Sequence, residues 1–413
     1  MELFHIISVL LVLSALFAYI NIRFLKLPGT IGIMLLSLIF SLLILFSGQV
    51  LPQFKIFIAS KLNTLNFSEL LLEELLSFML FAGAFHIKYE DLKSEKLSIF
   101  LFSTLSVILN TVIIGFASYF LFSLFGIKLS LINAMLFGAL ISPTDPIAVL
   151  GILKTCNISK SLETRISGES LFNDGVGVVI FLTILKIAGS DPDFGTGEIL
   201  LLFGQEALGG LLLGILLGFI GYRLFVAIDN YKTEVLITIA IVMGGYTLAH
   251  YLHVSGPLTM VVAGLITGNH GKTFGMSATT IEYVDKFWEL IDDILNAILF
   301  VLIGLELIVI NTDITIITVS VLLIIVVLLS RYTSLLIPSI LTRLKEKIYG
   351  KTLILMTWAG LRGGISIALA LSVPADLGKD ILVTSTYVIV CFSILVQGLT
   401  IKKLAGKIMN VKN

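Results

Sequence analysis

Apolar runs of about twenty residues recur along the whole chain, and short polar stretches separate them. A helix that crosses a bilayer needs roughly 20 mainly apolar residues. The pattern therefore predicts thirteen spans, near residues 3–20, 28–47, 66–87, 97–125, 129–153, 165–188, 198–228, 233–252, 255–270, 286–309, 314–341, 351–373 and 380–401. The division between the eighth and ninth rests on the stretch HYLHVSGPL. A single helix there would give twelve spans and place both termini on one side.

Composition agrees with this pattern. The 413 residues are 57% hydrophobic and 13% charged, with a mean hydropathy of +1.07, whereas soluble domains are about 25% charged. The chain is therefore expected to be an all-α polytopic membrane protein with a single membrane domain over 1–413. The zero net charge gives no indication of nucleic-acid binding. Two cysteines imply neither a disulfide framework nor a metal site, and no cofactor is expected.

The basic residues predict the orientation. Loops on the cytoplasmic side of a membrane protein are rich in Lys and Arg. With the N-terminus outside, the outer loops hold only Lys55, Lys61, Lys128, Lys186 and Lys379. The inner loops and tail hold Arg23, Lys26, Lys88, Lys93, Lys96, Lys154, Lys160, Arg165, Arg223, Lys232, Lys272, Lys286, Arg343, Lys345, Lys347, Lys351, Lys402, Lys403, Lys407 and Lys412. This asymmetry supports an odd number of spans and a cytoplasmic C-terminus. The first run has Glu2 and no basic residue before it, so it is expected to be a retained helix.

The fifth predicted span contains a charge between two helix breakers, in LISPTDPIAVL at residues 140–150. Pro143 and Pro146 cannot donate a backbone hydrogen bond, so the helix should break near Thr144 and Asp145. A broken backbone at membrane depth is tolerated where it lines a cavity or is buried in protein. Its free carbonyls and half-helix ends can hold an ion. The alternative is a kinked packing helix with a hydrogen-bonded aspartate.

The sixth span carries a polar cluster within GESLFNDGVGVVIF, residues 168–181. Ser170 and Asp174 are four residues apart, as are Glu169 and Asn173, and such pairs share a helix face. Oxygen ligands suit a small hard cation. A carboxylate in apolar surroundings also suits a proton, because a bare charge there is costly. A structural polar cluster is the alternative interpretation.

Two arginines fall inside predicted spans, where a charge costs at least roughly 2.5–3.5 kcal/mol. Arg331 needs a carboxylate partner, and Glu169 is the preferred one; snorkelling to the inner face is the alternative. Arg362, within GLRGG, is either an accessory site residue or an interfacial anchor. Glu306 lies near the outer end of its span, where we expect it to be solvated.

The broken fifth span and the glycine-interrupted twelfth span occupy corresponding positions if the chain divides into two six-helix repeats. Interrupted helices at matching positions are the sequence sign of a transporter site between inverted-topology repeats. We therefore expect crossed discontinuous helices, a first repeat over 1–188, a linker helix over 198–228 and a second repeat over 233–405. Spans four to six and eleven to thirteen would form the transport core, and the others a scaffold with a dimer interface.

Four stretches together resemble the NhaP-type sodium/proton antiporters, and the likeness covers essentially the whole chain. They are SPTDPIAV, GESLFNDGVGVV, FVLIGLEL and GLRGGISIALAL. This family is the electroneutral branch of the monovalent cation/proton antiporter superfamily, which also contains the eukaryotic sodium/proton exchangers. The resemblance implies a homodimer with elevator-like alternating access, which exchanges one cation for one proton. One departure is Ala82 in LFAGA, where some relatives carry an acid, so it stays open whether the third span supplies a ligand.

The resemblance also assigns roles to residues. It implies that Asp174 is the essential carboxylate that binds either cation or proton. Asp145 and Thr144 would line the site, and Ser170 would add a ligand oxygen, so that Na⁺ is held by these four residues. Asn173 stands where the electrogenic branch has aspartate, which favours electroneutral exchange. Glu169 and Arg331 would form a structural ion pair in the core.

Other functions stay open at this stage. An intramembrane aspartyl protease also needs two membrane carboxylates. Its usual Tyr-Asp and Gly-x-Gly-Asp signatures do not surround Asp145 and Asp174, so we do not expect an enzyme. A cation channel of the same fold, or exchange of K⁺ or Li⁺ in place of Na⁺, is compatible with the sequence. The short C-terminal tail and the lack of an organelle-targeting sequence favour a prokaryotic plasma membrane.

Overall fold

The computed structural model describes residues 2–47, 75–145, 147–156, 158–189, 196–308, 313–342 and 349–408, and all regular structure in these ranges is helical. The first half of the chain contains α1 Glu2–Ile20, α2 Gly29–Ser47, α5 Leu76–His86, α6 Tyr89–Ser103, α7 Leu105–Leu124, α8 Leu131–Ile141, α9 Ile147–Thr155 and α10 Lys160–Gly189. The second half contains α11 Thr196–Ala227, α12 Tyr231–Tyr251, α13 Gly256–Ile266, α14 Lys272–Phe274, α15 Ala278–Glu306, α16 Ile314–Leu341, α17 Tyr349–Ala359, α18 Gly364–Ser372, α19 Lys379–Phe392 and α20 Gly398–Ile408.

The all-helical membrane fold predicted from the hydropathy pattern is confirmed. Within the described ranges, eight helices are long and apolar enough to cross a membrane. A ninth span results if α17 and α18, bent by 54° at their junction, count as one. The eighth and ninth predicted spans are separate helices, because α12 ends at Tyr251 and α13 begins at Gly256. The total of thirteen stays a prediction, since part of the third predicted span lies outside the described residues.

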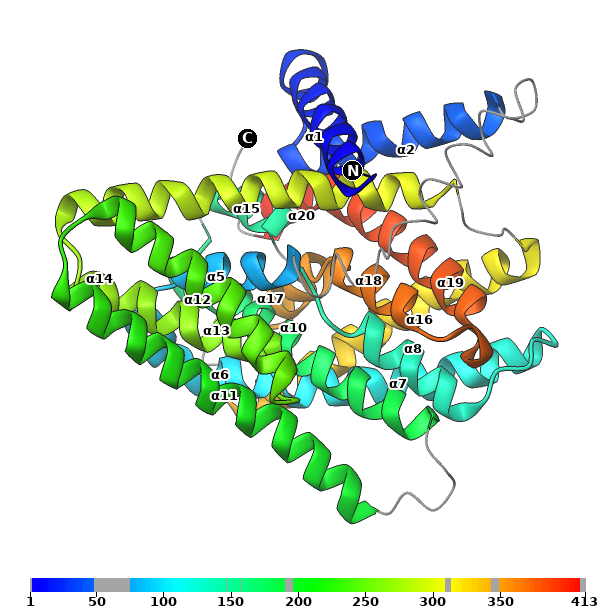
Figure 1. Cartoon of the computed structure of the whole chain (residues 1–413). Coiled ribbons are helices and arrows are strands. Elements are labelled where there is room, and N and C mark those ends of the chain that lie inside the picture. Colours follow the sequence, from blue (N-terminus) through cyan, green and yellow to red (C-terminus); the bar gives the residue numbers. More distant parts are fainter. Residues whose placement is uncertain are drawn as a thin grey trace.

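The helices pack in two groups that mix distant parts of the sequence (Figure 1). In one group α7 contacts α8 and α16, α10 contacts α6 and α8, and α19 contacts α16 and α18. In the other, α13 contacts α5 and α11, and the long helix α15 contacts α1, α2, α5 and α12. The first group contains the helices of the predicted transport core and the second those of the predicted scaffold. The inverted repeats themselves remain a prediction.

The outer surface of the bundle is apolar. On α11 the side chains of Leu208, Leu212, Leu216 and Phe219 are each more than half exposed. Water would penalise such a continuous apolar stripe, whereas lipid chains solvate it. Polar side chains are instead concentrated inside, where Asn110, Asn173 and Ser385 are fully buried. This inverted distribution means that the polar interior holds the functional groups.

Candidate cation and proton site

Two helix breaks meet within the first helix group. The chain is non-helical between α8 and α9 at Ser142–Asp145, and between α17 and α18 at residues 360–363. The backbone N–H of Asp145 donates to the carbonyl of Leu361 at 2.8 Å. Each break therefore supplies a hydrogen-bonding partner to the other, which satisfies backbone groups that no helix satisfies. This arrangement matches the crossed discontinuous helices expected from the sequence.

Charged side chains lie at the helix ends that the breaks expose. Arg362 is 2% exposed, and its Nη1 donates to the carbonyls of Ser142, by a short contact, and of Pro143 at 2.9 Å. These carbonyls are at the C-terminal end of α8, where the helix dipole favours a cation. Arg362 is thus buried between the two breaks and is not an interfacial anchor at the membrane surface.

Asp145, in contrast, lies at a helix N-terminus, that of α18. A Cβ atom on Gly363 would come within 2.8 Å of the Asp145 carboxylate oxygen Oδ2. Gly363 directly precedes α18, whose N-terminus carries a partial positive charge that favours an anion. The glycine is needed here because any side chain would displace the carboxylate. The GLRGG stretch therefore provides both a cation for one helix end and space for an anion at the other.

The polar cluster of α10 faces the first break. Asn173 Nδ2 donates to Thr144 Oγ1 at 2.8 Å, and its Oδ1 accepts from the Thr144 N–H at 3.4 Å. Ser170 Oγ donates to the Thr144 carbonyl at 2.7 Å. Asn173 and Ser170 therefore fix three polar groups of one residue in the unwound segment. The neutral amide of Asn173 performs this role without adding a charge beside Asp174.

Asp174 differs from Asn173 and Ser170 because its buried carboxylate oxygen makes no hydrogen bond within the described residues. Its side chain is 7% exposed, and its Oδ1 is buried without a hydrogen-bond partner among the described residues. The charges of Asp145 and Glu169 are near enough to act on it. A buried, unpaired carboxylate oxygen costs about 1–3 kcal/mol or more. The orphaned oxygen of Asp174 is therefore the group in this cluster most suited to accept a cation or a proton.

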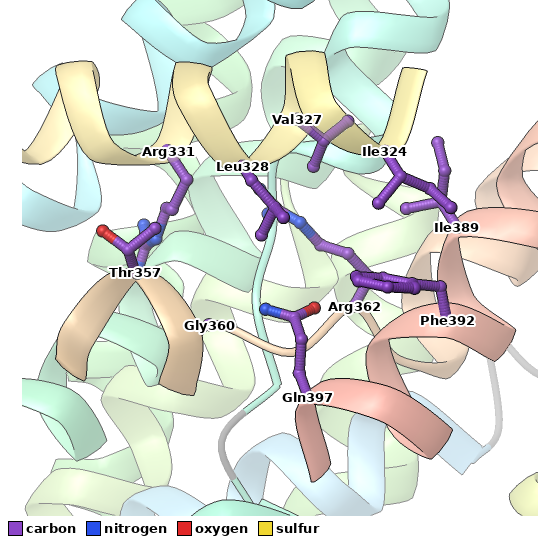
Figure 2. A pocket seen from close by; sticks show the side chains of 10 residues that line it. All are labelled: Ile324, Val327, Leu328, Arg331, Thr357, Gly360, Arg362, Ile389, Phe392 and Gln397. Atoms are coloured by element: carbon purple, nitrogen blue, oxygen red, sulfur yellow. The ribbon is translucent and has the colours of Figure 1, made fainter. Parts of the chain in front are cut away.

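Behind the breaks, Arg331 Nη2 on α16 lies 2.5 Å from Glu169 Oε1 on α10, and both side chains are 3% exposed. The structure thus brings together the two residues that the sequence suggested as partners. Figure 2 shows Arg331 and Arg362 near a small cavity of about 10 Å³ that Gly360 and Gln397 also line. Such a cavity is about the minimum for one water molecule.

Helix α15 differs from the sequence analysis in two respects. Glu306, expected to be solvated, is only 7% exposed because α15 extends to the end of its span within the bundle. Sequence reasoning also overlooked Asp292 and Asn296, although an acid inside a predicted span was itself a signal. The described part of the third span, α5, has the buried Ala82 and no acidic residue.

The ligand set available at Asp174 is a mixed one. Among the described residues, no three His, Cys, Asp or Glu side chains converge closely enough to hold a metal ion. Neutral hydroxyl and carbonyl oxygens of Thr144 and Ser170 lie where the first break contacts α10 and are candidate ligands beside Asp174. Few charged ligands and several neutral ones suit a monovalent cation that must be released again.

Crossed broken spans with a buried carboxylate between them define the class of secondary transporters with a site at mid-membrane. The family model "Sodium/hydrogen exchanger, transmembrane" matches residues 12–407, and the chain belongs to this family.

Similar proteins agree with this assignment. The chain is 44% identical to the Na⁺/H⁺ antiporter NhaP of Pseudomonas aeruginosa over 411 residues, which cover 98% of this chain and 96% of that protein. It is 32% identical to the Na⁺/H⁺ antiporter NhaH of Halobacillus dabanensis, with 97% of each chain covered. The fold is similar to the solved structure of the sodium proton antiporter MjNhaP1 from Methanocaldococcus jannaschii, with a TM-score of 0.77 and 21% identity over 99% of this chain and 100% of that chain.

Proposed function

We propose that the protein is an electroneutral antiporter that exchanges Na⁺ for H⁺ across the plasma membrane, with both ions competing for Asp174. The observation that carries this proposal is the buried Asp174 Oδ1, which has no hydrogen-bond partner among the residues that the structure describes, beside the crossed breaks. The names of the similar antiporters support the choice of ions. Li⁺ and K⁺ are the cations to test beside Na⁺.

Competition at one carboxylate is sufficient for antiport. The low-polarity surroundings penalise a bare charge on Asp174, so the carboxyl group holds either a proton or a cation. Asp145, Thr144 and Ser170 supply the remaining oxygens when the cation is bound. Either loaded state leaves the side chain without net charge at this position. Alternating access of the transport core then carries one cation one way and one proton the other, and no net charge moves.

The remaining residues position these ligands. Asn173 holds Thr144, and Arg362 neutralises the α8 carbonyls that would otherwise compete for the cation. Glu169 and Arg331 compensate each other and keep the two halves of the core together. We further propose that the N-terminus lies outside and the C-terminus in the cytoplasm, on the basis of the lysine and arginine distribution. A homodimer is proposed from the resemblance to the NhaP-type antiporters alone.

The test uses purified protein in liposomes with an acidic interior and a pH-sensitive dye. Adding Na⁺ outside should collapse the gradient in the wild type, and Asp174→Asn should abolish this response because Asn cannot exchange a proton. Clamping the voltage with valinomycin and K⁺ should leave the sodium rate unchanged. A rate that follows the voltage would favour a channel or an electrogenic exchanger. Exchange by Asp174→Asn at the wild-type rate would refute the site.

A further inference from the structure

Helix α10, which carries Asp174 in the first helix group, packs directly against a helix of the second group. A Cβ atom on Gly175 would come within 2.6 Å of Leu258 Cδ2 on α13, and Leu258 is 5% exposed. The backbone of α10 therefore lies against α13 at the residue next to Asp174. Glycine permits this close approach, because it has no side chain. The two helix groups are thus in contact at this side of Asp174.

An ion pair connects the same two helix groups farther along α10. Lys186 lies in the last turn of α10, and its Nζ donates to Glu206 Oε1 on α11 at 2.8 Å. The side chain of Lys186 is 44% exposed, whereas that of Glu206 is only 9% exposed. A carboxylate so little exposed needs a counter-charge. The first helix group supplies this counter-charge to the second.

Glu206 belongs to a corner where α11 and α13 are joined by hydrogen bonds. Its backbone carbonyl accepts from the N–H of Ser255 at 3.0 Å. Thr259 Oγ1 donates to the carbonyl of Gly210 at 3.1 Å. A Cβ atom on Gly210 would come within 2.7 Å of the Ser255 carbonyl oxygen, so the two backbones are in close contact. If the transport core moves relative to this corner, the pair of Lys186 and Glu206 must separate.

The helix groups are apart on the opposite side of the molecule. A cavity of about 980 Å³ lies between α1, α2 and α15 on one side and α9 and α20 on the other. Helices α9 and α20 contact each other and also contact α10 and α17. Lys26 and Lys402 line the cavity, and both belong to stretches that the positive-inside rule places in the cytoplasm, whereas Lys186 falls in a predicted outer loop. The described structure is therefore closed at the outer boundary and open at the cytoplasmic one.

We propose that Lys186 and Glu206 form an outer latch, an ion pair that holds the transport core in its cytoplasm-facing position and opens before Asp174 faces the outside. The proposal rests on the proposed antiport function with alternating access. An interaction that is present in only one of two states shifts the population toward that state. The outer latch therefore determines what fraction of the molecules presents Asp174 to each side of the membrane.

The outer latch predicts opposite changes of apparent affinity on the two faces. In liposomes with protein of known orientation, Lys186→Met should lower the apparent KM for Na⁺ at the outer face about threefold, the value of a partly exposed ion pair. The same variant should raise the KM at the cytoplasmic face, because apparent affinity follows the fraction of molecules open to that face. A merely structural loss would move both KM values in the same direction. Thermal unfolding in detergent verifies that each variant is folded.

Two further variants isolate the pair from general charge effects. Lys128→Met is the matched control, because Lys128 is an exposed lysine of another predicted outer loop and forms no ion pair with a residue that the structure describes. It should leave both KM values unchanged. Lys186→Met combined with Glu206→Gln should lower the outer KM no more than Lys186→Met alone, because the same interaction is lost only once. Additive changes, or an equal change in Lys128→Met, would overturn the outer latch.

Covalent closure of the outer latch provides the second measurement. Cys156 and Cys391 are first replaced by serine, and Lys186→Cys and Glu206→Cys are then bridged with a short bis-methanethiosulfonate reagent. The bridged protein should lose exchange and recover it after reduction with dithiothreitol, because the core cannot leave the corner of α11 and α13 while the bridge is present. Exchange by the bridged protein at the unbridged rate would overturn the outer latch. Failure of the wild type to exchange Na⁺ for H⁺ would instead contradict the antiport function itself.

Discussion

The two helix breaks interrupt their helices at the same place in the bundle, but one carries an acidic side chain and the other a basic one. The described part of the break between α8 and α9 contains Pro143 and the acid Asp145. The break between α17 and α18 is formed by Gly360, Leu361, Arg362 and Gly363. The proline removes helical hydrogen bonds by lacking a donor. The glycines instead allow close approach of other groups: Gly363 leaves space for Asp145, and Gly360 leaves space for Arg331 of α16.

Because of this difference, each break depends on groups that the other supplies. Arg362 in the second break donates a hydrogen bond to a backbone carbonyl of the first break. The carboxylate of Asp145 in the first break lies beside Gly363, at the N-terminus of α18. The first break faces α10 and Asp174, and the second holds it in place. We therefore expect variants of the first break to change ion binding and variants of the second to change mainly stability.

The largest expected effect comes from the ion pair that links the helices behind both breaks. Glu169→Gln leaves the Arg331 guanidinium buried without a counter-charge, which typically costs about 3–5 kcal/mol. The purified variant should unfold at a markedly lower temperature in detergent. Adding Arg331→Met should recover part of the loss, because the unpaired charge is then removed. An unchanged unfolding temperature in Glu169→Gln would show that the pair contributes nothing to the core.

Removing the arginine of the second break should have the next largest effect. Arg362→Met loses two charge-assisted hydrogen bonds to the end of α8, and we expect a loss of about 2–3 kcal/mol in unfolding free energy. Both hydrogen bonds come from the single nitrogen Nη1. Arg362→Lys retains the charge and one nitrogen with several N–H donors, so its loss should be smaller. Chemical unfolding of the three proteins in detergent gives the ranking. A lysine variant less stable than the methionine variant would contradict this assignment.

Removing one hydrogen bond from each break should have the smallest effect on stability, but it should distinguish the roles of the two breaks most clearly. Asn173→Ala releases Thr144 in the first break, and Ser393→Ala removes the hydroxyl that accepts the Arg362 N–H at 2.8 Å in the second. Each should cost about 1 kcal/mol. Only Asn173→Ala should raise the KM for Na⁺ in the liposome assay, because Thr144 is a proposed ligand. Equal changes of KM in the two variants would remove the distinction between the breaks.

The sequence predicted the helical class, both breaks and the proximity of Glu169 to Arg331, because these follow from long apolar runs, helix-breaking residues and the cost of an unpaired charge. It did not predict the role of Arg362, because the carbonyls it binds lie some 220 residues away. The interactions of Thr144 with Asn173 and Ser170 likewise depend on the crossing of separate helices. The burial of Glu306 was mispredicted, because position along a span does not determine which neighbour covers a side chain.

The central claim is that sodium and a proton exclude each other at Asp174. The most direct test is isothermal titration of purified protein with NaCl in two buffers of different ionisation enthalpy, which gives the number of protons released for each Na⁺ bound. The account predicts a release that approaches about one proton as the pH is lowered, together with weaker apparent binding, because Na⁺ must then displace a proton. Sodium binding without proton release, and with an affinity independent of pH, would contradict it.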